Sequence, residues 1–100
     1  MIKHIVCWKL INRAGTPEHN ADALAIREVL HGLRGRIPGL IHIEVGFDFS
    51  GKETSGDVVL YSEFESREAL ALYQHHPLHV EAGKTVRPRT CDRRMIDYEI

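Results

Sequence analysis

The first ten residues place the strongest constraint on the fold of this chain. From Ile2 to Leu10 the side chains alternate with a period of two, which is typical of a β-strand. One set of alternate positions is almost entirely apolar, and the other set still carries Ile5 and Cys7. Because apolar surface is unfavourable in water, we expect this strand to lie in a sheet that is at least partly covered on both faces.

Helical and strand periodicities continue along the chain. Thr16-Pro17-Glu18 is a typical helix start, because threonine caps the first turn and proline fits the first helical position. Apolar residues at helical spacing then predict one buried stripe, made by Ile26, Leu30, Leu33 and Ile37. We expect this helix to continue to the Pro38-Gly39 turn, and Ser66 to cap a second helix. Alternation predicts three further strands, over residues 40–49, 57–64 and 91–100.

The resulting β-α-β-β-α-β order predicts a ferredoxin-like α+β fold. Right-handed crossovers give a four-stranded antiparallel sheet in the order 4-1-3-2, with the helices on one face. We expect residues 1–100 to form a single domain. Apolar side chains on the uncovered sheet face predict a homodimer that packs through its sheet faces into a dimeric α/β barrel.

Composition narrows the partners and the location. The net charge of −1 gives no electrostatic case for nucleic acid, and no apolar run approaches the ~20 residues that cross a membrane. The N-terminus lacks a signal-peptide pattern, so we expect a cytoplasmic protein. Antiparallel pairing of the first and last strands would place Cys91 closer to Leu10 than to Cys7, which predicts buried, reduced thiols rather than a disulfide.

The segment from Tyr73 to Val80 contains three of the seven histidines. Pro77 disfavours a helical conformation at His76 and suits the first position of a helix. We therefore expect one helix to end near His75 and a short one to begin at Pro77. His79 then lies in the first turn of the short helix, where the helix dipole favours a neutral imidazole. A neutral imidazole can accept a proton as a general base.

Metal, cofactor and anion sites are not expected. The spacing of His75, His76 and His79 would suit metal ligands on a continuous helix, but Pro77 interrupts that helix. No glycine-rich phosphate loop or nucleotide motif is present, and no residue specifically requires haem or flavin. A small basic run is expected to be a solvated edge rather than an anion site; it comprises Arg87, Arg89, Arg93 and Arg94.

Several of these motifs occur together, in order, in one known family. They are Ile2-Lys3-His4-Ile5-Val6, Phe64-Glu65-Ser66, the Tyr73–Val80 segment, Val86-Arg87-Pro88 and Asp97-Tyr98. With them the chain resembles the stress-responsive α/β-barrel (Dabb) family, which is related to dimeric α/β-barrel proteins. The resemblance implies a homodimer with a pocket between each sheet and its own helices. Most members of this family have no assigned reaction.

One plant branch of the family consists of olivetolic acid cyclase-type polyketide cyclases. These enzymes close a linear polyketide by an intramolecular aldol condensation. The resemblance implies that His79 is the base, that Tyr73 is its neighbour in the site, and that His4 also contributes. The chain departs from this branch near Val59, where the plant enzyme has a further pocket histidine.

The sequence leaves three functions open. The first is a dimeric protein that binds a small hydrophobic or aromatic carbonyl compound, with no assigned reaction. The second is a cofactor-independent polyketide cyclase-like or isomerase-like enzyme, in which His79 is the general base and Tyr73 or His4 donates to the enolate oxygen. The third is a purely structural dimer whose histidines only pack. The residues expected to line the pocket are His4, Trp8, Tyr73, His76 and His79.

Overall fold

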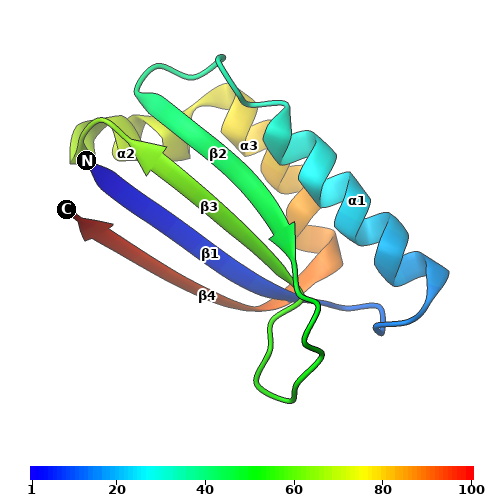
Figure 1. Cartoon of the computed structure of the whole chain (residues 1–100). Helices are drawn as coiled ribbons and strands as arrows, with labels where there is room; N and C mark the ends of the chain where they lie inside the picture. The colour runs from blue at the N-terminus through cyan, green and yellow to red at the C-terminus, as the bar shows by residue number, and fades with distance from the viewer.

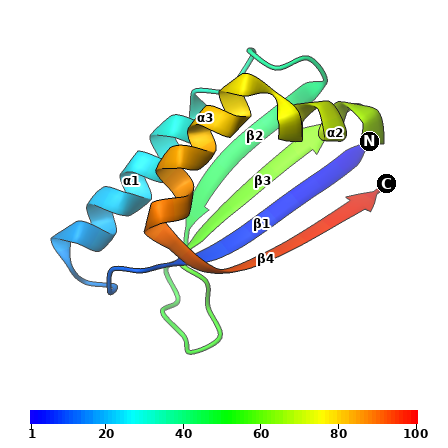
Figure 2. The ribbon, with the colours of Figure 1, turned by 180° about the vertical axis from the view of Figure 1, so that it is seen from behind.

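A computed structural model describes all residues, 1–100, as one antiparallel sheet with its helices on one face (Figures 1 and 2). The elements are, in order, β1 (Ile2–Leu10), α1 (Pro17–His31), β2 (Leu40–Phe47), β3 (Val58–Phe64), α2 (Arg67–His75), α3 (Pro77–Val86), a 3₁₀ turn (Arg87–Arg89) and β4 (Thr90–Glu99). No helix is both long and apolar enough to cross a membrane.

The sheet has the strand order β2-β3-β1-β4, and every neighbouring pair is antiparallel. This confirms the predicted ferredoxin-like topology. The central strand β1 pairs with β3 from Ile2 opposite Phe64 to Trp8 opposite Val58. Its even-numbered side chains are buried beneath the helices, and its odd-numbered ones lie on the opposite face. His4 and Trp8 therefore lie on the helix-covered side.

Local signals set most of the helix ends. The Thr16 hydroxyl accepts a hydrogen bond from the His19 amide at 3.2 Å, and the Ser66 hydroxyl accepts one from the Ala69 amide at 3.0 Å. As predicted, α2 ends at His75 and α3 begins at Pro77. His76 between them is extended, with ψ of 136°, because the following proline excludes the helical conformation.

Two predicted element ends are wrong. Helix α1 ends at His31 instead of continuing to Pro38, because a series of turns follows it. These turns still fold Leu33 and Ile37 back into the core, which explains why the apolar spacing continues beyond the helix. Strand β2 ends at Phe47, and Phe49 lies in the following loop with its side chain fully exposed.

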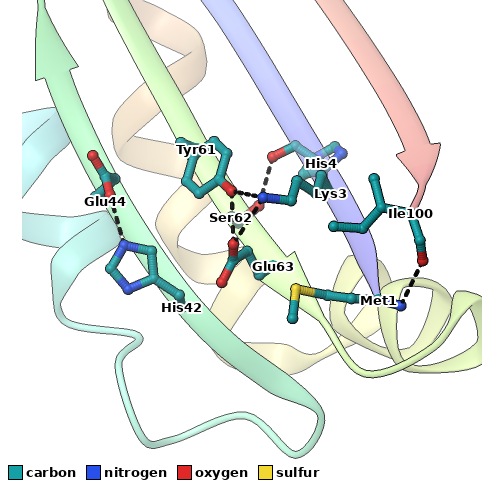
Figure 3. Close-up of polar contacts among 9 residues, drawn as sticks. All are labelled: Met1, Lys3, His4, His42, Glu44, Tyr61, Ser62, Glu63 and Ile100. Carbon is teal, nitrogen blue, oxygen red and sulfur yellow. Dashed lines mark hydrogen bonds and ion pairs between the residues drawn. The ribbon is translucent and has the colours of Figure 1, made fainter.

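The sheet face opposite the helices is uncovered in the single chain. It carries partly exposed apolar side chains, among them Ile96 (58% exposed) and Tyr98 (41%). The same face holds a polar cluster in which Lys3 Nζ lies 2.5 Å from the Tyr61 hydroxyl and 3.2 Å from Glu63 Oε2 (Figure 3). The face is therefore mixed, with an apolar part centred on β1 and β4.

The two cysteines are free thiols. In the β1–β4 ladder, Cys91 pairs with Lys9 and Cys7 pairs with Arg94. The two cysteines are therefore not opposite each other, as predicted. The expectation that both thiols are buried is wrong, since Cys7 is half-buried and Cys91 is exposed at the start of β4.

Candidate functional site

A cavity of about 570 Å³ lies between the sheet and the helices, bounded mainly by β1, α3 and the start of β4. This volume is in the range of small-molecule sites. Its apolar walls are formed by Val6, Trp8, Leu30, Leu60 and Val86. Its principal ionisable side chains are His4, His79, Arg87, Asp92 and Arg93. A largely apolar cavity with a few converging polar groups is the usual form of a ligand site.

His79 lies in the first turn of α3 and is half-buried. Its Nδ1–H donates a hydrogen bond to the Gln74 carbonyl at 3.2 Å, which leaves Nε2 as the nitrogen with the free lone pair. Burial lowers the pKa of the His79 imidazole below its usual 6.5, and the hydrogen bond to Gln74 opposes this shift. The ring is therefore neutral near pH 7, chiefly through burial rather than through the helix dipole on which the sequence prediction relied.

His4 lies on β1, and its ring is almost completely buried. Its Nδ1–H donates to Oδ1 of Asp97, which is its direct partner in the β1–β4 ladder. Its backbone carbonyl accepts a hydrogen bond from the Ser62 hydroxyl at 2.8 Å (Figure 3). The bond to Asp97 fixes the orientation of the ring and leaves Nε2 available to the cavity, and the bond from Ser62 holds the backbone of β1. Asp97 did not appear among the predicted site residues, although the β1–β4 register would have identified it.

Tyr73 lies on α2 with its side chain fully buried. Its ring centre is 4.3 Å from that of His79, 4.8 Å from that of Phe64 and 6.4 Å from that of His4. The hydroxyl has no hydrogen-bond partner within the chain, and burial raises the pKa of Tyr73, so the phenol is neutral. Contrary to the sequence prediction, Tyr73 does not line the cavity, because its ring lies packed against the two imidazoles in the core.

The structure thus brings His4, Tyr73 and His79 together, and it places His4, Trp8 and His79 on the cavity wall. His76 lies outside the wall, contrary to the sequence prediction. Its Nδ1 accepts a hydrogen bond from the Leu78 amide at 3.1 Å and so caps the start of α3.

Two cavity residues were not predicted as site residues. Arg87 follows the last residue of α3, and Arg93 lies near the start of β4 beside a register shift in the β1–β4 ladder. The sequence showed them only as part of a basic run, although alternation back from Asp97 would have placed Arg93 on the helix-covered face. The structure contains no group of three or more histidine, cysteine, aspartate or glutamate side chains arranged to hold a metal ion.

Comparison with known proteins identifies the family. The model of the stress responsive A/B barrel domain matches residues 2–100. The chain belongs to this family. No curated protein sequence matches it.

Several solved structures resemble this Dabb-family chain. A dimeric protein of unknown function with a ferredoxin-like fold, from Bacteroides fragilis, is 34% identical, with a TM-score of 0.85 over 99% of this chain and 95% of that one. A Dabb-family protein with a ferredoxin-like fold from Mesorhizobium loti is 24% identical, with a TM-score of 0.75 over 99% and 95%. A hydroxynitrile lyase from Passiflora edulis is 16% identical, with a TM-score of 0.75 over 99% and 92%, and shares the fold. One fold therefore hosts proteins with different functions, and the function must be argued from the site.

Proposed function

We propose that this Dabb-family protein binds a small, largely apolar carbonyl compound in the cavity between its sheet and helices. The observation that carries the proposal is the cavity of about 570 Å³, with apolar walls and two imidazoles on its lining. A purely structural role would not require His4 and His79 to keep their Nε2 atoms free of protein partners. Both rings use only Nδ1 for hydrogen bonds within the chain.

Ligand binding is tested by thermal shift with a panel of aromatic and polyketide-like carbonyl compounds. A ligand at one hundred times its dissociation constant stabilises the folded state by about 2.7 kcal/mol. We expect this stabilisation in the wild type and in His75→Ala, and its loss in His79→Ala. His75 is a matched control, because it is an exposed histidine at the end of α2 with no side-chain hydrogen bond. Equal stabilisation of all three proteins would contradict the proposal.

We also propose that the protein is a homodimer that associates through its sheet faces. The uncovered face carries exposed apolar side chains, and the relative from Bacteroides fragilis is described as dimeric. Burying these side chains against a second copy would remove them from water. The free thiols, one of them exposed, suit the reducing cytoplasm that we propose as its location.

Sedimentation velocity tests the dimer. We expect Ile96→Asp on the sheet face to shift the protein to a monomer. Leu72→Asp on α2 is the matched control, since Leu72 is 69% exposed and Ile96 is 58% exposed, but Leu72 lies on the helical side. A wild-type monomer, or equal dissociation by both variants, would contradict association through the sheet.

A second candidate function is cofactor-independent chemistry at a carbon next to a carbonyl group. The observation that favours it is the neutral His79, whose pKa is lowered by burial and whose Nε2 is free. In this reaction the C–H bond breaks, its proton passes to His79 Nε2, and the electron pair moves to the carbonyl oxygen as an enolate. His4, oriented by Asp97, donates to that oxygen from Nε2 when it is protonated. Tyr73 acts as a positioning residue that packs against both rings, since its buried side chain does not line the cavity.

Proton exchange separates this enzyme from a binding protein. The rate at which a cyclic 1,3-diketone exchanges its α-protons in D₂O is followed by NMR with wild type, His79→Gln and His75→Gln. We expect catalysed exchange that disappears only in His79→Gln. Binding of the diketone without catalysed exchange would leave the binding function and refute the enzyme. A dimer that neither binds nor exchanges would be the purely structural protein.

A further inference from the structure

The cavity carries positive charge that the chain does not neutralise. Arg87 and Arg93 line it, and neither side chain takes part in a salt bridge or a side-chain hydrogen bond. The carboxylate of Asp92, which also lines the cavity, lies 3.0 Å from Arg94 Nη1. The nearby Asp97 carboxylate is bonded to His4. Two guanidinium groups on the wall are therefore left without an anionic partner.

Arg93 lies on this wall beside a backbone irregularity. The β1–β4 register shifts between Cys7 and Lys9, and Asp92 on the bulged strand has φ of +49°. Positive φ is uncommon outside glycine, although aspartate tolerates it better than most residues. Regular alternation back from Asp97 places Arg93 on the helix-covered face, and the irregularity lies between Arg93 and the start of β4. Bulges of this kind often occur beside functional sites. Arg94 pairs with Cys7 on the uncovered face, whereas Arg93 lines the cavity.

Gly83 leaves room on α3 for the other guanidinium. Arg87 lies one helical turn after Gly83, and a Cβ atom added to Gly83 would lie 2.5 Å from Arg87 Nη1. The guanidinium therefore occupies the space that any other residue at position 83 would fill with its side chain. The charge therefore lies close to the surface of α3, along the cavity.

The two arginines and the two histidines lie at opposite ends of the cavity. His79 is in the first turn of α3, and Arg87 follows the last residue of that helix. Eight residues at a rise of 1.5 Å separate their Cα atoms by about 12 Å. On β1, the lining residues His4 and Trp8 are four residues apart, which separates their Cα atoms by about 13 Å at 3.3 Å per residue. The apolar walls lie between the two ends.

We infer that the ligand of this cavity is an elongated, apolar keto acid: Arg87 and Arg93 bind its carboxylate, and its ketone lies beside His4 and His79. This rests on the proposed function, since it names the class of ligand for the same cavity. A guanidinium fork matches a carboxylate with two parallel hydrogen bonds. Arg87 and Arg93 are exposed, as expected for a solvated edge, and the proposal adds a ligand carboxylate as their partner. The charges of both arginines also contribute to the lowered pKa of His79, so a bound carboxylate raises that pKa.

Binding is measured by calorimetry with 6-acetyl-2-naphthoate and with 6-acetyl-2-naphthamide, which has the same shape without the charge. We expect the acid to bind wild type at least tenfold more tightly than the amide. Arg87→Gln and Arg93→Gln are each expected to remove at least tenfold of the acid's affinity and to leave the amide unchanged. Arg36→Gln is the matched control, because it removes the same charge from an exposed arginine in the turn after α1.

Gly83→Ala tests the position of Arg87 without removing a charge. Alanine is the better helix former, so the variant is expected to remain folded with an equal or higher melting temperature. Its methyl group displaces the Arg87 guanidinium, and the acid is expected to lose affinity while the amide does not.

The outcomes separate this inference from the proposed function. Equal affinity of acid and amide in the wild type, lost in His79→Ala, would overturn the carboxylate and leave the binding function intact. Unchanged acid affinity in both Arg87→Gln and Arg93→Gln would also overturn it. Binding of neither compound would overturn both proposals.

Discussion

The unpartnered hydroxyl of Tyr73 leads to an unusual stability prediction. The side chain is fully buried, yet its oxygen makes no hydrogen bond within the chain. A buried hydroxyl without a partner costs about 1–3 kcal/mol relative to its hydration in water. Tyr73→Phe removes this cost and keeps the ring that packs against His79 and Phe64. We expect the free energy of unfolding to rise by about 1–3 kcal/mol.

The size of this effect makes it easy to measure. For a domain of this size, 1 kcal/mol changes the melting temperature by about 4–8 °C. Urea denaturation of wild type and Tyr73→Phe gives the free energy directly, provided that both are measured at one protein concentration, since dimerisation adds to stability. Equal m-values for the two proteins would show that the substitution changes stability and not the surface area exposed on unfolding.

Tyr61→Phe is the matched control with the opposite sign. The Tyr61 hydroxyl lies 2.5 Å from Lys3 Nζ and 2.6 Å from Glu63 Oε2 on the uncovered face (Figure 3). Its removal is expected to lower the free energy of unfolding by about 0.5–1.5 kcal/mol. If Tyr73→Phe instead destabilises the protein by about 1 kcal/mol or more, the hydroxyl has a partner and the reasoning is refuted.

Two further predictions concern the imidazoles. Burial lowers the pKa values of His31 and His79 below 6.5, so the unfolded chain binds protons at these residues more readily than the folded chain does. The free energy of unfolding should therefore fall as the pH drops through 6.5. His79→Gln should make the free energy from urea denaturation between pH 5 and 8 less dependent on pH. A pH dependence unchanged in His79→Gln would contradict this. Asp97→Asn replaces the charged acceptor of the His4 Nδ1–H and should lower the free energy of unfolding by about 1 kcal/mol. Glu99→Gln is the control, because it removes a carboxylate from the exposed end of β4. An equal effect of both variants would show that only surface charge matters.

Features set by neighbouring residues were predictable from the sequence. Proline at position 77 excludes a helical His76 on steric grounds alone, so the break between α2 and α3 followed directly. Thr16 and Ser66 cap their helices through bonds that span three residues. The alternation in β1 similarly identified the buried face, on which His4 lies.

Features that depend on distant contacts were not predictable. The end of α1 at His31 was missed because Leu33 and Ile37 are buried by turns and keep the apolar spacing of a helix. The bond between His4 and Asp97 joins residues 93 positions apart in the sequence. The shift of register that leaves Asp92 at positive φ, at the start of β4, exists only in the paired strands.

The burial of Tyr73 illustrates the limit of helical spacing as a guide. Its position on α2 indicated an inward-facing ring, as observed. Helical spacing does not show whether that ring reaches the cavity, because this depends on which side chains of β1 and α3 lie between the ring and the cavity. His79 and His4 occupy the cavity wall, and Tyr73 lies packed against them.

The protonation of His79 is the most direct test of the central claim that a neutral imidazole presents its free Nε2 to a cavity ligand. Two-bond ¹⁵N–¹H NMR correlation reports both the tautomer and the pKa of each histidine. We expect His79 to be the Nδ1–H tautomer at pH 7, to titrate below 6.5, and to shift when 6-acetyl-2-naphthoate is added, while His75 does not shift. A His79 that is the Nε2–H tautomer, or that titrates at or above 6.5 in the free protein, would contradict the claim.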